Sequence, residues 1–578
     1  MKNISFRAHF LKDLYDIKIL VFISLFLYFP ITFLSVSQPI IIGYAVQYVL
    51  QHDVNSSIYH FPLLFFLVLL SLVSLECIQG FCLQKSGQRL VKNLRRKGFI
   101  KLQKLPMSFL DNMQIGKLLT RLANDAESVA ELFSMGAVQI VGDILFLLST
   151  MILLLVLDSK LSFYAFLSLP ILFFGMAFAR YFTKVTFIKS RQALSSLNAY
   201  LAEYLLGNAT IQMFNKLTDS YSLFSKYSNN YIKINKKSAF IDASIYSFID
   251  AISYITFAFV LWGAFNLKEE NALKISVLVA FIEALSRFYG PIRDFSTRYT
   301  VFENSMVSLS RIYDLLGWPE EKDGQNNQQF SYFQHKIEFK NVNFAYQESV
   351  LVLKNISFSI NKGQKYALVG YTGAGKSSVI KLINRFYSVS SGEILIDDIN
   401  IEKLSLSQLR NMISIVPQEI FLFKGTIKDN LCFGKLDASD EEIWHALALV
   451  QLDEMVIKRG GLLSEVSTKG QNFSQGEKQL LAFARTIIAN PPIIILDEAT
   501  ASVDKLTEKK LKLATKSLLN NRTAIIIAHR LATIKDSDEI LFFHEGSIIE
   551  RGSHQELMSK NSQYKRLVSL QEKEHKNN

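Results

Sequence analysis

Residues 370–377 read GYTGAGKS and directly follow the apolar run KYALV. Glycines at this spacing let the backbone wrap so that successive N–H groups point at phosphate oxygens at the start of a helix. Lys376 can then reach the terminal phosphates of a nucleotide, and the Ser377 hydroxyl can coordinate magnesium. The helical pattern SSVIKLINRF comes next, so this stretch predicts a strand, a phosphate-binding loop and a helix.

A pair of carboxylates lies further along the chain, after the apolar run of IIILDEAT at 493–500. A buried strand here would deliver Asp497 to the magnesium shell and Glu498 to the attacking water, the division of labour that phosphoryl transfer needs. An acidic pair at a strand end is a weak signal by itself. Behind a phosphate-binding loop, it indicates a site that hydrolyses nucleotides.

From residue 336 onward, short runs rich in β-branched residues alternate with helical patterns. The runs include IEFKNVNFAY, EILIDD, ISIVPQ and AIIIAHR, besides the two already quoted. This alternation is typical of a sheet layered with helices. We therefore expect one domain over 336–578, preceded by a polar linker over 319–335, PEEKDGQNNQQFSYFQH.

The chain before this linker is apolar enough to cross a membrane. The 578-residue chain is 49% hydrophobic, and six runs reach about the 20 residues that span roughly 30 Å of hydrocarbon as a helix. They lie near 19–49, 59–83, 133–157, 161–183, 240–266 and 273–292. The first run is too long for a signal peptide and lacks a small-residue cleavage site, so we expect it to remain as a span. These runs predict a transmembrane domain over 1–318.

The loops between these runs differ in charge. Those after the second and fourth runs are long and rich in Lys and Arg, whereas QHDVNSS, between the first two runs, contains neither. By the positive-inside rule, both long loops and both chain ends are cytoplasmic. Lys and Arg residues that flank spans explain the formal net charge of +12 better than nucleic-acid binding does. The three cysteines have neither the number and spacing of a disulfide framework nor the spacing of a zinc site. The long loops keep helical periodicity with few breakers apart from Pro106, so we expect spans 2 to 5 to continue as helices beyond the bilayer.

The motifs GYTGAGKS, FSQGEKQ at 473–479 and IIILDEAT, in this order, resemble those of ATP-binding cassette (ABC) exporters, and the resemblance covers essentially all 578 residues. It implies an all-α six-helix transmembrane domain followed by an α/β P-loop ABC ATPase domain. It also implies that the protein uses ATP and Mg²⁺ to export hydrophobic or amphipathic compounds across a bacterial inner membrane, as one half of a dimer. The more specific pattern is similar to that of MdlB-type multidrug-resistance-like exporters.

The resemblance also implies roles for individual residues. Catalytic roles fall to Glu498, to the switch histidine His529 in IIIAHR and to the Q-loop residue Gln418 in SIVPQE. Tyr346 in FAYQES matches the aromatic residue that stacks on adenine, with an ordinary strand tyrosine as the alternative. Ser377, Gln418 and Asp497 would hold the metal. The nucleotide-binding set is Tyr346, Gly370, Tyr371, Thr372, Gly373, Ala374, Gly375, Lys376, Ser377, Ser378, Ser474, Gly476 and Asp504.

Two stretches of the cytoplasmic loops resemble the coupling-helix regions of the same exporters. They are LPMSFLDNMQIGKLLTRLANDAESV at 105–129 and LAEYLLGNATIQMFNK at 201–216. The resemblance implies that these loops carry the contact between the membrane helices and the ATPase domain.

One motif departs from the family pattern. The usual signature is LSGGQ, whereas this chain has FSQGE at 473–477. Ser474 and Gly476 remain, so a hydroxyl and a backbone N–H can still face a γ-phosphate across a dimer interface. Glu477 is either the capping carboxylate of a Ser-x-x-Glu box or an awkward negative charge beside a triphosphate. Degenerate signatures are familiar in heterodimeric bacterial exporters, so the resemblance favours a homologous half-transporter partner, with a homodimer as the alternative.

Ionisable residues within apolar runs are costly and often line transport pathways, and Asp143, Asp250 and Glu283 are of this kind. Glu283 and Arg287 are four residues apart, which predicts a mutual ion pair on one helix face. The substrate stays open between multidrug efflux and lipid flipping. The second function class is a non-pumping ABC protein, such as a nucleotide-gated channel or a regulatory subunit. Glu498 argues against it, because a gate needs ATP binding whereas a pump needs turnover.

Overall fold

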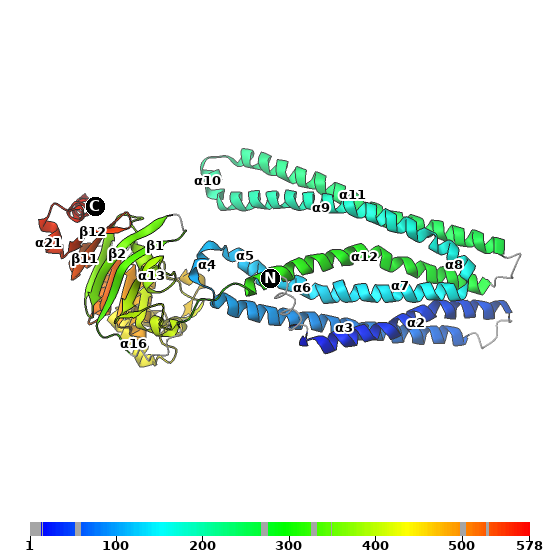
Figure 1. Cartoon of the computed structure of the whole chain (residues 1–578), viewed down its shortest axis with the longest axis horizontal. Helices are drawn as coiled ribbons and strands as arrows, with labels where there is room; N and C mark the ends of the chain where they lie inside the picture. Colours follow the sequence, from blue (N-terminus) through cyan, green and yellow to red (C-terminus); the bar gives the residue numbers. More distant parts are fainter. Residues whose placement is uncertain are drawn as a thin grey trace. The chain divides into compact units, whose positions relative to one another are not determined.

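The computed structural model describes residues 13, 15–51, 59–267, 275–324, 332–347, 350–497, 505–527 and 531–577. The chain divides into two compact units (Figure 1). The helical unit comprises Met1–Gln103 and Gln114–Trp318, and the α/β unit comprises Lys104–Met113 and Pro319–Asn578. The predicted boundary at residue 318 leaves Lys104–Met113 in the helical domain, whereas the coupling-region resemblance at 105–129 already implies that this stretch contacts the ATPase domain.

The helical unit contains the segments expected to cross a membrane. Within the described residues, six helical segments are long and apolar enough to do so, by length and composition. They are Lys18–Gln51, His60–Gln103, Ile115–Leu157, Ser159–Leu206, Leu217–Phe265 and Ile275–Leu316. Their lengths of 34 to 49 residues far exceed the about 20 that cross the hydrocarbon layer. The six predicted runs and the helical continuation predicted for spans 2 to 5 are both confirmed.

The helices of this unit follow the same order along the chain. They are α2 (Lys18–Gln51), α3 (His60–Gln103), α5 (Ile115–Thr120), α6 (Ala126–Glu131), α7 (Ala137–Leu157), α8 (Ser159–Phe166), α9 (Ser168–Leu206), α10 (Asn208–Met213), α11 (Leu217–Leu267) and α12 (Ile275–Leu316). π-Helical turns at Arg121–Asp125 and Leu132–Gly136 join α5, α6 and α7. Asp158 separates α7 from α8, because its Oδ1 accepts a hydrogen bond from the backbone N–H of Leu161 at 2.9 Å and so caps α8.

In Figure 1, α2, α3, α7 and α12 lie alongside one another, and α9 and α11 form a separate pair. Helix α2 packs on α3 and α12, α7 packs on α12, and α9 packs on α11. Buried leucines such as Leu90, Leu94 and Leu154 fill the contacts. Large apolar side chains also cover the outside, including Phe173 and Phe174 of α9, as expected where lipid is the solvent.

Three acidic residues within the spans, Asp143, Asp250 and Glu283, are paired with arginines of α12. Arg287 Nη2 lies 3.0 Å from Glu283 Oε1, which confirms the predicted ion pair, and Arg287 Nη1 also donates a hydrogen bond to Gln38 Oε1 at 2.6 Å. Arg298 Nη1 lies 2.9 Å from Asp143 Oδ2. Arg293 and Asp250 form a further pair. These acids are therefore compensated within the unit.

The α/β unit is built from strands and short helices. Its strands are β1 (Lys336–Ala345), β2 (Leu351–Asn361), β3 (Lys365–Gly370), β4 (Ser391–Ile396), β5 (Ile399–Asn400), β6 (Ile413–Val416), β7 (Gly425–Thr426), β8 (Glu465–Val466), β9 (Ile493–Asp497), β10 (Thr523–Ile527), β11 (Glu539–His544) and β12 (Ser547–Gly552). Its helices are α4 (Met107–Asn112), α13 (Lys376–Ile383), α14 (Leu406–Met412), α15 (Ile427–Leu431), α16 (Asp440–Leu449), α17 (Asp453–Lys458), α18 (Gln475–Ala489), α19 (Lys505–Leu519), α20 (Leu531–Lys535), α21 (His554–Ser559) and α22 (Gln563–Asn577).

Two sheets organise the described part of this unit. The smaller sheet is antiparallel and has the order β2-β1-β4-β5. The larger sheet is parallel except for β12 and has the order β12-β11-β3-β10-β9-β6. Strands β7 and β8 form a separate short pair. Strand β9 shows why the larger sheet is rigid. Ile494 and Leu496 face one hydrophobic core, whereas Ile493 and Ile495 face the other, so both faces of the strand are buried. The α/β architecture that follows the helical domain is thus as predicted.

Candidate nucleotide site

The predicted site motifs follow strands that end at one edge of the parallel sheet. In the sheet register, Ile527 of β10 lies opposite both Leu368 of β3 and Asp497 of β9, and Leu496 lies opposite Val416 of β6. Because the carboxyl ends of parallel strands meet at the same edge, the segments that follow these strands start close together.

Each of these strands leads into a predicted motif. The phosphate-binding loop follows β3, and Gln418 lies two residues after β6. Glu498 follows β9 directly and His529 comes two residues after β10, but Glu498, His529 and Asp504 lie outside the described residues. The topology therefore brings the starts of segments that lie up to about 150 residues apart in the chain to one edge of the sheet.

Three glycines of the phosphate-binding loop, Gly370, Gly373 and Gly375, have a left-handed backbone, and at Gly370 and Gly375 a side chain would also lack space. Gly370 has φ +149°, and a Cβ there would lie 2.2 Å from the backbone oxygen of Phe543. Gly375 has φ +101°, and a Cβ there would lie 2.7 Å from the side chain of Leu353. Both positions therefore need glycine for conformation and for space. Helix α13 begins immediately afterwards, at Lys376.

Lys376 is packed over the loop that it follows. Its Nζ donates hydrogen bonds to the carbonyl oxygens of Gly370 at 2.7 Å and Tyr371 at 3.0 Å, and the residue is only 6% exposed. Burial lowers the pKa of the Lys376 ammonium, and the negative charge of Asp497 opposes that shift. An ammonium, a hydroxyl at Ser377, a carboxylate at Asp497 and a run of loop N–H groups suit the phosphates of a nucleotide and its metal ion.

Tyr346 lies directly after the end of β1 rather than within it. Its hydroxyl is 3.1 Å from the Ser378 hydroxyl, which ties it to the first turn of α13. The Tyr387 ring meets it edge-on, with centroids 5.1 Å apart, and the residue stays 43% exposed. An exposed aromatic ring anchored beside the phosphate-binding loop is available for stacking on a base.

A second group of side chains, not found by the sequence reasoning, connects this tyrosine to α4. Lys381 Nζ lies 5.2 Å from the centre of the Tyr346 ring and 3.0 Å from Asp111 Oδ2 on α4. The Tyr387 hydroxyl donates a hydrogen bond to the same Asp111 oxygen at 2.8 Å. Burial alone would raise the pKa of Asp111, but the hydrogen bonds from Tyr387 and Lys381 and the charge of Lys381 hold it below its usual range.

The signature segment forms the start of α18. The Ser474 hydroxyl accepts a hydrogen bond from the backbone N–H of Glu477 at 3.2 Å, and Glu477 Oε2 accepts one from the Ser474 N–H at 2.8 Å. This reciprocal pair is a capping box, so the capping interpretation of Glu477 is confirmed. Among the described residues, no hydrogen bond or ion pair links Ser474 or Gly476 to the phosphate-binding loop.

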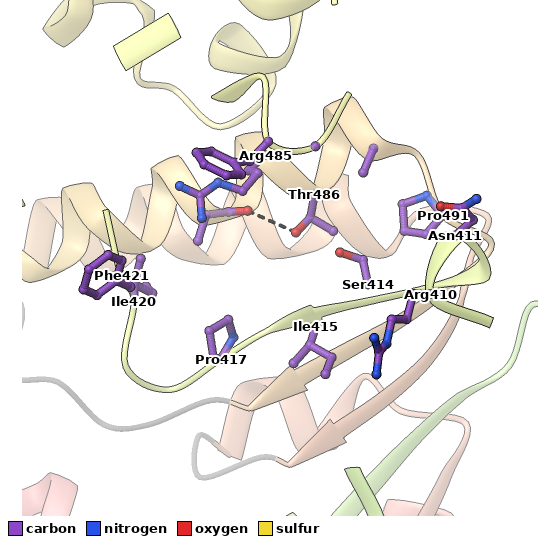
Figure 2. A pocket seen from close by; sticks show the side chains of 14 residues that line it. Arg410, Asn411, Ser414, Ile415, Pro417, Ile420, Phe421, Arg485, Thr486 and Pro491 are labelled. Atoms are coloured by element: carbon purple, nitrogen blue, oxygen red, sulfur yellow. Dashed lines mark hydrogen bonds between the residues drawn. The ribbon is translucent and has the colours of Figure 1, made fainter. Parts of the chain in front are cut away.

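The loop that carries Gln418 borders a groove of about 290 Å³ between β6 and α18. Figure 2 shows Pro417, Ile420 and Phe421 along the loop side of this groove, and Arg485 and Thr486 on the helix side. Arg485 is fixed by hydrogen bonds from its Nε to the Asn430 carbonyl oxygen at 2.9 Å and from its Nη2 to Asn430 Oδ1 at 3.3 Å. The groove is therefore a partly apolar depression directly beside the Q-loop residue.

Comparison with known proteins agrees with these features. The family model described as the ABC transporter transmembrane region matches residues 21–292, and the model described as ABC transporter matches residues 353–501. The uncharacterised ABC transporter ATP-binding protein YknV of Bacillus subtilis is 36% identical over 487 residues, which cover 84% of this chain and 81% of YknV. The probable multidrug resistance ABC transporter ATP-binding/permease protein YheH of the same organism is 33% identical, over 85% of this chain and 74% of YheH.

A solved structure matches nearly the whole chain. A bacterial Atm1-family ABC exporter with ATP bound superposes with a TM-score of 0.79 over 96% of this chain and 98% of that one, at 24% sequence identity. At this identity the likeness concerns the fold, which pairs a membrane-spanning helical part with an α/β nucleotide-binding part. With both family models matched in order on one polypeptide, the chain belongs to the ABC transporter family, as a fused transmembrane and ATP-binding protein.

Proposed function

We propose that this chain is one half of a dimeric exporter that hydrolyses ATP to move hydrophobic or amphipathic compounds out of a bacterial cell. The observation that carries the proposal is the joint presence, in one ABC transporter chain, of membrane-length helices and a sheet edge on which the nucleotide motifs converge. In this assignment, residues 1–318 form the transmembrane domain, 319–335 the linker and 336–578 the ATPase domain. The segment Lys104–Met113 is the part of the first domain that packs with the second.

The proposed site holds ATP with Mg²⁺. The loop from Gly370 to Ser378 wraps the phosphates, Lys376 compensates their charge, and Tyr346 stacks on adenine. Ser377, Gln418 and Asp497 would hold the metal ion, which neutralises charge that develops on the phosphates. Glu498 orients the attacking water, and His529 contacts the γ-phosphate.

Dimerisation completes the site in this proposal. Among the described residues, no hydrogen bond or ion pair joins Ser474 or Gly476 to the phosphate-binding loop, which supports a site whose opposing signature comes from a second half-transporter. Asp504 belongs to the loop that is proposed to cross between the two nucleotide domains. Two identical chains would place Glu477 at both γ-phosphates, whereas a heterodimer confines it to one. We favour a homologous partner with an LSGGQ-like signature, because degenerate signatures such as FSQGE are familiar in heterodimeric bacterial exporters.

Coupling between ATP and the membrane helices is proposed to use both cytoplasmic loops. Helix α4 already contacts Lys381 and Tyr387 of the α/β unit through Asp111. The tip of the second loop, around α10, exposes Leu206 (89%), Met213 (80%) and Phe214 (71%) in a region beyond the apolar runs. Exposed apolar side chains that lipid does not cover need a protein surface, and we assign this tip to the groove beside Gln418 of the partner half-transporter.

The distribution of charged residues supports an orientation of the chain in the membrane and a class of substrate. The basic loops support an orientation in which both chain ends are cytoplasmic, for a multi-pass protein of the bacterial inner membrane. Because Asp143, Asp250 and Glu283 are each paired with an arginine, they offer no uncompensated charge to a cargo. This supports a hydrophobic or lipid-like substrate over a strongly charged one, and the name of YheH points to drug-like compounds.

The direct test is ATP hydrolysis by the protein reconstituted in lipid, alone and with candidate partner half-transporters, as a function of added hydrophobic compounds. We expect ATP hydrolysis that a substrate stimulates and that Lys376→Ala removes. ATP binding without turnover in every combination would instead indicate a nucleotide-gated protein.

A further inference from the structure

Arg459 lies against the signature segment at the start of α18. Its Nη2 is 3.2 Å from Glu477 Oε2 and 3.4 Å from Glu477 Oε1, so the guanidinium contacts both carboxylate oxygens. Its Nη1 donates a hydrogen bond to the carbonyl oxygen of Asn472 at 2.9 Å. The guanidinium carbon also lies 4.3 Å from the centre of the ring of Phe473, which is buried.

This arrangement fixes the guanidinium at three points before any ligand binds. Arg459 directly follows α17, and the next residues, Gly460 and Gly461, have φ of +103° and +90°, so the chain turns sharply away after the arginine. The side chains of Arg459 and Glu477 are only 31% and 24% exposed. A partly buried, doubly contacted arginine–carboxylate pair stacked on an aromatic ring is more ordered than an ordinary surface ion pair.

Without Arg459, the charged groups at the start of α18 would have opposite effects on an approaching phosphate. The N–H groups at the start of α18 carry partial positive charge and favour an approaching phosphate. Glu477, in the first turn, places a full negative charge at the same end, which repels a triphosphate. The guanidinium of Arg459 cancels that charge while leaving Glu477 able to accept the Ser474 N–H.

We propose that Arg459 is a positioning residue of the signature segment, which neutralises Glu477 so that the start of α18 can approach the γ-phosphate of ATP held by the partner half-transporter. The inference rests on the proposed function, since it requires two ATPase domains that close over ATP. It explains how a signature with glutamate in place of glutamine remains able to face a nucleotide.

The test measures the ATP concentration that half-closes the paired ATPase domains. Full-length protein with its partner is reconstituted in lipid, hydrolysis is slowed by Glu498→Gln, and closure is followed by the distance between spin labels on the two ATPase domains. Arg459→Ala should raise the half-closing ATP concentration roughly tenfold, because Glu477 then faces the triphosphate uncompensated. Added salt, from about 0.1 M to about 0.5 M, should reduce the defect by screening the repulsion.

The double variant separates charge from structure. If Arg459 acts by neutralising Glu477, then Arg459→Ala combined with Glu477→Gln should return the half-closing ATP concentration to within about threefold of Glu477→Gln alone. Lys336→Ala is the matched control: it removes a cation paired with Glu338 at the opposite end of β1 from Tyr346, and it should not change closure.

Other outcomes overturn the inference. An unchanged half-closing concentration in Arg459→Ala, or a double variant as impaired as Arg459→Ala, would mean that Arg459 does not act through the charge of Glu477. Failure of the parent protein to close with ATP, together with hydrolysis that does not depend on Lys376, would overturn the proposed function itself. The two failures are therefore distinguishable.

Discussion

The carboxylate of Asp111 lies 3.0 Å from the ammonium of Lys381, although 270 residues separate the two in the chain. Tyr387 donates to the same carboxylate, and both Lys381 and Tyr387 contact the Tyr346 ring. Helix α4 lies in a segment whose neighbours on both sides belong to the helical unit. Its Asp111 is thereby joined to Tyr346, the residue proposed to stack on adenine. If Tyr346 stacks on adenine, these contacts offer a direct route between the nucleotide and α4.

Replacing Asp111 with Asn should weaken coupling more than hydrolysis. The pair is about one-third exposed, so we expect its loss to cost less than ~1 kcal/mol of stability. Substrate stimulation of ATP hydrolysis should fall several-fold while basal hydrolysis is retained, and Asp111→Glu, which keeps the charge, should be milder. Equal losses of transport and of basal hydrolysis would contradict a role of Asp111 in coupling.

The contact of α4 should be insensitive to pH near neutrality. The pKa of Asp111 lies below its usual range, so its contribution to stability is complete above about pH 4, the ordinary carboxyl value, and is lost only as the pH falls further. Burial, followed by the hydrogen bond to Asp111, raises the pKa of Tyr387, so the phenol remains a donor at alkaline pH. The difference in melting temperature between the wild-type protein and Asp111→Asn should be constant from about pH 6 to about pH 9. A difference that already shrinks near pH 6 would indicate a raised pKa of Asp111.

Two variants at the ATP site should fail in different ways. Glu498→Gln should bind ATP but hydrolyse it about 10² to 10⁴ times more slowly, because the water loses its general base, and should accumulate closed dimers. Lys376→Ala should instead weaken ATP binding, because the phosphates lose their ammonium partner. Equilibrium nucleotide binding and single-turnover phosphate release distinguish the two. Near-normal turnover of Glu498→Gln would remove Glu498 from its assigned role.

The loop around α10 should cross-link to the groove beside Gln418 of the other half-transporter. After Cys77, Cys82 and Cys432 are replaced by Ser, a cysteine at Ala209 of one protomer and a cysteine at the groove position of Phe421 in the other should form a disulfide between chains. Leu570, which is exposed on α22, provides the control position for the second cysteine. A cross-link only at the control position would place the α10 tip elsewhere.

The partner is expected to be a different chain. Co-expression with a homologous half-transporter that has an LSGGQ-like signature should produce a stable complex whose ATP hydrolysis exceeds that of either chain alone. In that complex, Glu477→Gln should affect turnover much less than Glu498→Gln, because Glu477 would face the nucleotide that is held rather than hydrolysed. Full cooperative hydrolysis by this chain alone would show that heterodimerisation is not obligatory.

Much of the fold could be predicted from local pattern. The membrane helices follow from the length of apolar runs, and strands β1, β3, β4, β6, β9 and β10 coincide with the β-branched runs read from the sequence. The break between α3 and α4 could also be predicted from local sequence, because Pro106, a helix breaker, immediately precedes α4.

The contacts that organise the site were harder to predict, because they join residues that are distant in the chain. Arg459 follows a helix of ordinary composition, and only its distance to Glu477 in the folded chain identifies it. In the sequence, Lys381 and Tyr387 look like surface residues of a helix and of the loop that follows it. Only the folded structure shows that both contact Asp111. Periodicity reports which face of an element is buried, but it carries no information on which side chains meet across elements.

The assignment of Lys104–Met113 to the α/β unit has a consequence for any attempt to divide the protein into fragments. A gene fragment that begins at the linker encodes an ATPase without ten residues of its own compact unit, and it leaves Lys381 and Tyr387 without their carboxylate. Such a fragment would contain the strands of both sheets but not the contacts that α4 makes through Asp111. A peptide with the sequence of 104–113, supplied separately, would offer the isolated ATPase the same carboxylate.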